Sequence, residues 1–227
     1  KGYRQIDINL GCPFPMIAGK HKGAGMLLYP AQVAEVLAPI AEYPEIQFSL
    51  KMRLGWENAS ECMVLVELLN TLRLSRIALH ARTGKQQYKG HPDLEAFQGF
   101  YELCQHPLYY NGDIESLSDI RQILTRFPLL KGVFIGRGLL SSPLLAKEFK
   151  GNETFLPEQR MSIYFAFHEE LFSAYSQVLQ GETQLLVKMK TLWEYFLPET
   201  DRKLLKRIKK STRLQQYTES VKAIFTS

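Results

Sequence analysis

The chain has 227 residues, 45% of them hydrophobic and 22% charged, which is typical of a globular protein with an apolar core. No run approaches the roughly 18 consecutive apolar residues that a membrane helix needs, so the composition predicts no membrane segment. The net charge is +5, and residues 182–227 account for it with ten Lys and Arg against five Asp and Glu. This excess predicts a polyanionic partner for the C-terminal end, although a solvated helix face is the simpler alternative.

Up to about residue 150, short apolar runs alternate with longer amphipathic stretches. The apolar runs predict strands at residues 6–10, 47–52, 76–80, 107–110 and 132–135. The intervening stretches predict helices at residues 30–42, 60–72, 93–105, 116–126 and 139–149. Such alternation is typical of a parallel sheet covered by helices.

From residue 157 onward the pattern is helical only. The periodicity predicts helices at residues 157–180, 182–196, 200–210 and 212–225, with breaks at Gly181 and Pro198. We therefore expect two domains, an α/β domain at residues 1–152 and a helical domain at residues 153–227. Five βα units are fewer than the eight of a closed barrel, so the first domain is either an open sheet or a partial barrel.

Cys12 is distinguished by its position from the other two cysteines. Cys62 and Cys104 lie inside helical patterns, as small buried hydrophobes do, and no CxxC spacing suggests a disulfide framework or a metal site. Cys12 follows a predicted strand, beside a proline and ahead of a basic loop. It is a candidate nucleophile or proton donor, with packing as the alternative. The cysteine pattern fits a reducing, cytoplasmic compartment.

The residues that follow the predicted strands are polar, basic or Gly-rich. In parallel α/β folds, ligands bind at the carboxyl ends of the strands. These ends comprise residues 9–13, 51–53, 80–83, 111–113 and 136–138. The last one leads into a helix and can form an anion nest, in which Arg137 grips a phosphate. For residues 136–138 the alternative is a glycine turn that serves packing only. For His80 the alternative is a side chain that is hydrogen-bonded to a backbone carbonyl.

Five motifs in order, DINLGCPFP, LKMRLGW, LHARTGKQQYKG, NGDI and GVFIGRG, together resemble the tRNA dihydrouridine synthase family. The resemblance implies TIM-barrel units that bind FMN, followed by a helical domain that binds tRNA. It implies the reduction of particular tRNA uridines to 5,6-dihydrouridine, with NADPH as reductant. No metal is implied.

The resemblance also implies roles for residues on the substrate side. Cys12 matches the cysteine that protonates C5 of uracil, and Asn9 matches the asparagine that holds the base. Arg82 matches a basic residue near the substrate pocket. The loop with Lys20 and Lys22 lies over the barrel mouth in the family, where it can meet the tRNA.

On the cofactor side, the resemblance implies contacts to the flavin ring and to its ribityl phosphate chain. Lys51 and His80 match the residues at the ring. The ribityl and phosphate positions match Asn111, Gly112, Asp113, Gly136 and Arg137.

The C-terminal helices carry the expected tRNA contacts. Lys203, Lys206 and Lys210 share one helix face at their spacing, and they would bind phosphates with little base reading. The aromatic residues of this region are expected to form its core and not stacking platforms. They are Tyr164, Phe165, Phe167, Phe172, Tyr175, Trp193, Tyr195 and Phe196.

The family pattern begins with earlier strands that carry a flavin motif, and this chain matches only strands four to eight. We therefore interpret this chain as part of a full-length enzyme and expect it to bind FMN weakly or not at all. The full-length enzyme is expected to be a monomer. Two alternatives are an FMN-dependent oxidoreductase of a free pyrimidine or other small molecule, and an inactive tRNA-binding fragment. Salt-dependent tRNA binding would distinguish a tRNA-modifying enzyme from the first alternative. Flavin absorbance would distinguish it from the second.

Overall fold

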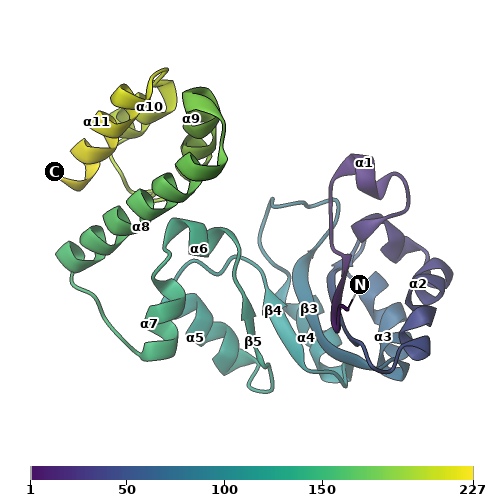
Figure 1. Ribbon diagram of the computed structural model, residues 1–227. Coiled ribbons are helices and arrows are strands. Elements are labelled where there is room, and N and C mark those ends of the chain that lie inside the picture. Colours follow the sequence, from purple (N-terminus) through teal and green to yellow (C-terminus); the bar gives the residue numbers. More distant parts are fainter. Residues whose placement is uncertain (1, 227) are drawn as a thin grey trace. The chain divides into compact units, whose positions relative to one another are not determined.

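The computed structural model describes residues 2–226, which form two compact units (Figure 1). Unit 1 comprises the residues up to Ile114 together with Ser118–Ile135. Unit 2 comprises Glu115–Leu117 and the residues from Gly136 onward. In the part of the chain that the structure describes, every helix is too short or too polar to span a bilayer.

Unit 1 is built on a sheet of five strands, all parallel. The strands are β1 Gln5–Leu10, β2 Gln47–Gly55, β3 Leu74–Thr83, β4 Leu108–Asn111 and β5 Gly132–Phe134. Their order in the sheet is their order in the chain. Because each right-handed crossover leads to the next neighbour, the connecting helices gather on one face, as in barrel-type (β/α) units and unlike doubly wound sheets. The predicted fold class is confirmed.

The two faces of the sheet differ in chemistry. On β2 and β3 the residues Leu50, Met52, Leu54, Ile77, Leu79 and Ala81 are buried, at 0 or 1% exposure. They alternate with polar side chains that point to the opposite face. Helix α3 contacts β2 and α4 contacts β3, so the apolar face is the one that the helices cover. The helices of unit 1 are α1 Pro15–Ala18, α2 Pro30–Leu37, α3 Glu61–Thr71, α4 Leu94–Leu103 and α5 Leu117–Arg126.

Two features of the helical layer differ from the sequence expectation. The helix predicted at residues 30–42 is α-helical only to Leu37, and continues as the 3-10 helix η2 Ala38–Glu42. Pro39, in the first turn of η2, lacks the N–H that a continuing α-helix needs. The second 3-10 helix, η1 Gly23–Leu28, and the four-residue α1 are too short to show a helical period.

Unit 2 is helical throughout its described residues. Its helices are α6 Arg137–Ser141, α7 Leu145–Gly151, α8 Pro157–Val178, α9 Gly181–Leu192, α10 Arg202–Lys210 and α11 Leu214–Phe225. The single helix predicted at residues 139–149 is wrong, because α6 and α7 are separate. Pro143 forces the preceding Ser142 out of the helical region, to φ −136° and ψ 86°.

The core of unit 2 is rich in aromatic side chains, as expected. Trp193, Phe196 and Tyr164 are buried, whereas Phe167 and Tyr195 are 36% and 38% exposed. Tyr217 accepts a hydrogen bond from Trp193 Nε1 at 2.9 Å, and its hydroxyl lies 2.7 Å from His168 Nε2. The compact boundary near residue 136 places α6 and α7 with the other helices. The functional division at residue 152 stays a prediction.

Candidate active site

Strand pairing gathers the polar side chains of the sheet into adjacent rows. In one row, Asn9 of β1 pairs with Lys51 of β2. In the next, Arg53 pairs with His80 of β3, which pairs with Asn111 of β4. Because registered residues of parallel strands point to the same face, these side chains share the face that the helices leave open. The sheet therefore brings together Asn9, Lys51, His80 and Asn111, as predicted from their strand ends.

Cys12 lies half-buried just beyond β1, and the segment that follows folds back onto it. The Ala24 N–H donates to the Cys12 carbonyl at 3.0 Å. Gly23 makes this approach possible. Its φ is +56°, and a Cβ there would lie 2.7 Å from Cys12 O and 2.9 Å from Cys12 Cβ. The glycine after the basic loop thus holds the cysteine backbone in place.

Asn9 and Lys51 form the part of the row nearest Cys12. Asn9 Oδ1 accepts the Gly11 N–H at 2.9 Å, which orients the side-chain amide. A Cβ on Gly11 would lie 3.5 Å from Asn9 Oδ1 and 3.6 Å from Lys51 Nζ, so the two side chains meet at this turn. Burial and the positive charge of Arg53 lower the pKa of Lys51, and Asp7 partly opposes them. A lysine held in this way is suited to an electron-rich ligand.

Arg53 connects the ends of β1 and β3. It is 1% exposed, its Nε donates to Gly11 O at 3.1 Å, and its Nη1 donates to Thr83 O at 2.8 Å and Gln87 O at 2.7 Å. Its guanidinium carbon lies 5.4 Å from the centre of the Tyr88 ring, a cation–π contact. Burial is the main cause that lowers its pKa.

Sequence analysis places Arg53 at a strand end but assigns a role neither to Arg53 nor to Tyr88. Arg53 stands two residues after Lys51 and so shares its face of the strand, which was the available signal. The Tyr88 ring also lies 6.3 Å from the His80 ring. Tyr88 is 54% exposed and thus bridges the buried cations and the surface. No sequence signal marks it.

Arg82 is the buried centre of an ion pair whose other member, Asp113, is 31% exposed at its side chain. Its guanidinium is bidentate to Asp113, with Nη1 to Oδ1 at 2.8 Å, and Nη2 also donates to Gly90 O at 2.6 Å. Arg82 is 1% exposed, so its donors serve the protein and not the surface. Its role beside a substrate, expected from the resemblance, would be exerted through the groups that it positions.

His80 is held in one tautomer by Arg82. Arg82 Nη1 lies 3.4 Å from His80 Nε2, and because a guanidinium only donates, Nε2 is the acceptor and Nδ1 carries the proton. Burial, followed by the charges of Arg53, Lys51 and Arg82, lowers the pKa of His80 to about 3. His80 is therefore neutral near pH 7, and its Nδ1–H is a hydrogen-bond donor.

The end of β4 and the two residues after it are used largely for internal contacts. Asn111 Nδ2 donates to Phe134 O of β5 at 2.8 Å. Gly112 has φ +149°, and a Cβ on it would lie 2.8 Å from the Tyr110 hydroxyl. Asp113 adopts φ +39° and pairs with Arg82. The predicted ribityl and phosphate contacts would therefore come from backbone groups of this segment or from the remaining Asn111 oxygen.

Gly136 and Arg137 belong to unit 2, where they begin α6. A Cβ on Gly136 would meet no atom within 4 Å, so space is open at this turn. The Ser141 hydroxyl donates a hydrogen bond to the Arg137 carbonyl at 3.1 Å. Their role as a phosphate grip stays a prediction.

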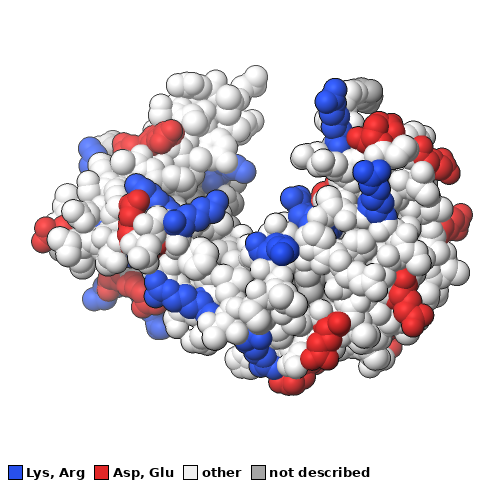
Figure 2. Space-filling model, turned by 90° about the horizontal axis from the view of Figure 1, so that it is seen from below, with Lys and Arg blue, Asp and Glu red and all other residues white. Residues whose placement is uncertain are grey.

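The predicted basic face of the C-terminal region lines a groove in unit 2. Lys203, Lys206, Arg207 and Lys210 of α10 face Gln216, Glu219 and Ser220 of α11 across a hollow of about 450 Å³. Asp201 caps α10 by accepting the N–H groups of Lys203 and Leu204. Figure 2 shows basic and acidic side chains scattered over one face of the molecule, among uncharged residues. The groove is therefore distinguished from the rest of the surface by the four basic residues that line it, and not by the net charge of the molecule.

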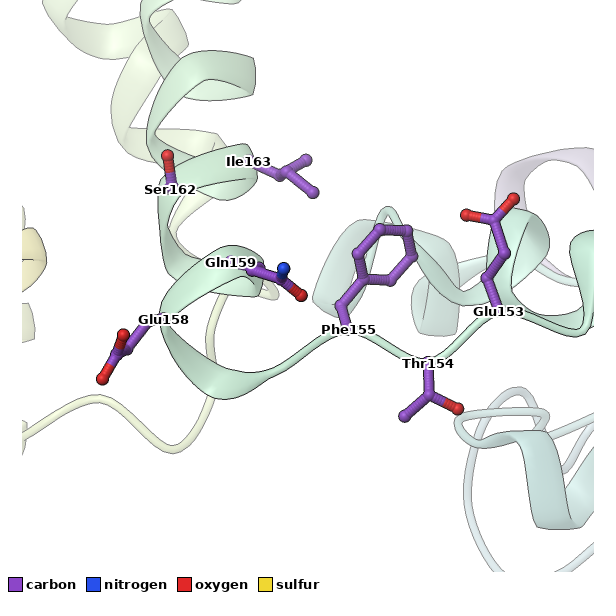
Figure 3. Close-up of a pocket in the computed structure, with 7 residues that line it drawn as sticks. All are labelled: Glu153, Thr154, Phe155, Glu158, Gln159, Ser162 and Ile163. Atoms are coloured by element: carbon purple, nitrogen blue, oxygen red, sulfur yellow. The ribbon is translucent and has the colours of Figure 1, made fainter.

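A second hollow of unit 2 has the opposite charge. It lies beside the start of α8 and is lined by Glu153, Thr154, Phe155, Glu158, Gln159, Ser162 and Ile163 (Figure 3). Both of its charged side chains are carboxylates, and they point away from each other in Figure 3. Such a lining does not suit a polyanion.

Comparison with known proteins gives one consistent result. The family described as "Dihydrouridine synthase (Dus)" matches residues 1–226. A "Probable tRNA-dihydrouridine synthase" of Rhizobium leguminosarum is 32% identical over 61% of this chain and 44% of its own. "tRNA-dihydrouridine synthase B" of Vibrio vulnificus is 28% identical over 69% of this chain and 50% of its own. A "Probable tRNA-dihydrouridine synthase" of Aquifex aeolicus is 36% identical over 64% and 46%. The chain spans about half the length of these relatives.

Proposed function

Because the chain belongs to the dihydrouridine synthase family, we propose that it serves the reduction of specific tRNA uridines to 5,6-dihydrouridine. FMN is the proposed cofactor, NADPH the reductant and tRNA the substrate. The observation that carries the proposal is the gathering of Asn9, Lys51 and His80 on one open sheet face, with Cys12 at its rim. The cytoplasmic location expected from the sequence is part of the same proposal.

Cys12 is the proposed proton donor to C5 of uracil. Gly23 fixes its backbone, and the thiol lies at the end of β1, where a ligand on the polar face would be within reach. The Asn9 amide, oriented through its bond to Gly11, is placed to hold a uracil carbonyl. Such orientation supports proton transfer because the thiol and the uracil ring are already placed for the reaction when the substrate binds.

The side chains of the polar face fit a flavin. Its ring presents carbonyl and imine acceptors, and the face offers the Lys51 ammonium and the Nδ1–H of a neutral His80. The cofactor, when bound, supplies the two-electron reduction. Asn111, Gly112 and Asp113 would meet its ribityl chain, and Gly136 and Arg137 its phosphate.

The helical part, residues 153–227, is the proposed tRNA-binding domain. The row of Lys203, Lys206 and Lys210 along one groove favours phosphate contacts, which depend on shape and charge more than on sequence. This groove favours tRNA over a free pyrimidine as the substrate, because a small molecule needs no such surface. Binding through it should weaken steeply with salt.

Activity on tRNA lacking dihydrouridine tests the proposal directly. Wild-type chain, Cys12→Ala and Cys104→Ala are compared with FMN and NADPH present, and dihydrouridine is quantified by mass spectrometry. Cys104 is the matched control, since it is also a half-buried free thiol. Cys12→Ala should lose product formation while keeping the flavin absorbance band, and Cys104→Ala should keep both. Full activity of Cys12→Ala would refute the role of the thiol. A wild-type chain that shows neither a flavin band nor product with excess FMN would refute activity of this chain by itself and would favour the alternative of an inactive tRNA-binding fragment.

The salt dependence of tRNA binding tests the helical domain. Removing one phosphate contact should reduce the slope of log K against log salt by about 0.7 to 0.9. Lys206→Gln should show this reduction, whereas Lys131→Gln, at an exposed position of unit 1, should not. Equal slopes for both variants would contradict tRNA binding in the groove.

A further inference from the structure

The turn after Cys12 exposes three large apolar side chains. Phe14 is 66% exposed, Met16 83% and Ile17 39%. Met16 and Ile17 stand on α1 and Phe14 is its N-cap; α1 projects beyond the end of β1 in Figure 1. We refer to these three side chains as the apolar knob. A cluster of exposed hydrophobic residues at a candidate site is costly in water and marks a surface that binds a partner.

The backbone beneath the apolar knob is held rigidly. Phe14 O accepts the N–H groups of Ile17 and Ala18, both at 2.9 Å, and prolines at 13 and 15 restrict the chain on either side. On the inner side, a Cβ on Gly25 would lie 2.3 Å from Ala18 O, so α1 packs directly on η1. A rigid apolar surface loses little conformational entropy on binding.

The charge around the apolar knob identifies the partner. Residues 8–34 contain Lys20 and Lys22 and no Asp or Glu. Both lysines and His21 are exposed, and the His21 ring stacks on Tyr29 at 4.3 Å. Apolar side chains flanked by cations suit a polymer that offers flat unsaturated rings along an anionic backbone. Single-stranded or unstacked nucleic acid has that chemistry.

We propose that the apolar knob stacks on a nucleobase of the tRNA adjacent to the uridine presented to Cys12. This inference rests on the proposed function. A uridine within folded RNA must leave its stack to reach an active site, and the gap exposes its neighbours. Apolar side chains inserted beside such a gap, as in proteins that unstack base steps, keep the base extruded. Phe14 is the stacking ring, and Met16 fills the space beside it.

Tryptophan fluorescence tests stacking directly. Phe14→Trp is titrated with an unmodified tRNA transcript and, separately, with heparin, a polyanion without bases. Leu129→Trp is the matched control, since Leu129 is 75% exposed and lies after α5. Stacking on a base should quench the added fluorescence of Phe14→Trp with tRNA and leave it unchanged with heparin, whereas Leu129→Trp should respond to neither.

A second measurement separates stacking from charge. Phe14→Ala combined with Met16→Ala should weaken tRNA binding about tenfold with an unchanged salt slope, whereas Lys20→Gln should reduce the slope. Quenching by heparin, or tRNA binding without quenching of Phe14→Trp, would overturn the stacking role and leave the proposed function intact. If the wild-type chain fails to bind tRNA in filter binding, the proposed function and this inference fall together.

Discussion

Replacing Gly23 with alanine should destabilise unit 1 more than the same change at Gly90. Both glycines have a left-handed backbone, with φ +56° and +64°, so an L-residue costs about 1–2 kcal/mol at either position. Around Gly90, a Cβ would meet only Gln86 Nε2 at 3.8 Å. At Gly23 it would lie 2.7 Å from Cys12 O, and relieving that clash should cost a further 1–3 kcal/mol, roughly, as overpacking does.

Hydrogen exchange of the β2 and β3 amides measures this difference within unit 1. Gly23→Ala should speed exchange well beyond Gly90→Ala, and it should also change the rate at which iodoacetamide alkylates Cys12. Equal exchange in the two variants, with unchanged alkylation, would refute the view that the loop packs against the cysteine.

Three further results are expected. His80 should stay neutral from pH 5 to 8, so its ¹⁵N imidazole shifts should be constant over that range. Its pKa is about 3 in the folded state and near 6.5 in the unfolded state, so between these values the unfolded state binds more protons. Unit 1 should therefore lose stability as the pH falls from 6.5 towards 3. A folded-state midpoint near 6.5 would contradict this. Arg82→Met should cost about 2 kcal/mol in urea unfolding, because it removes the buried partner of Asp113, whose side chain is 31% exposed. Lys85→Met, at a pair exposed on both sides, should cost under about 1 kcal/mol, and similar losses would refute the difference. Tyr217→Phe should destabilise unit 2 by about 2 kcal/mol because the buried Trp193 N–H loses its acceptor, and an unchanged unfolding midpoint would argue against that bond.

The positions of the strands were predictable, and the ends of two of them were not. Apolar runs located all five strands, because buried strands of a parallel sheet are continuously hydrophobic on the helix side. β2 and β3 continue through Arg53 and Arg82, to Gly55 and Thr83. A charged residue normally indicates a loop. Both are buried with the help of partners that are distant in the chain: Arg53 donates to carbonyls 42 and 30 residues away, and Arg82 pairs with Asp113, 31 residues away.

Part of the candidate site was predictable because the apolar strands themselves were predictable. Cys12, Lys51 and His80 follow apolar runs, and parallel pairing necessarily brings strand ends together. The contact between Arg53 and Tyr88 was not predictable, because it depends on how the loop after β3 folds back, which no local pattern encodes. In unit 2, helical periodicity located α8 to α11. The signal in the sequence that separates α6 from α7 is Pro143.

The bonds of Arg53 have a consequence for how unit 1 assembles in time. They join residues 42, 30 and 34 positions apart in the chain, so none forms until β1, β2 and β3 are paired. Contacts with such separation carry a high loop-closure cost, and they tend to follow the folding transition state. We expect φ-values near zero for conservative changes at Arg53, with faster unfolding and little change in the folding rate. The candidate site is then among the last parts of unit 1 to form and the first to be lost.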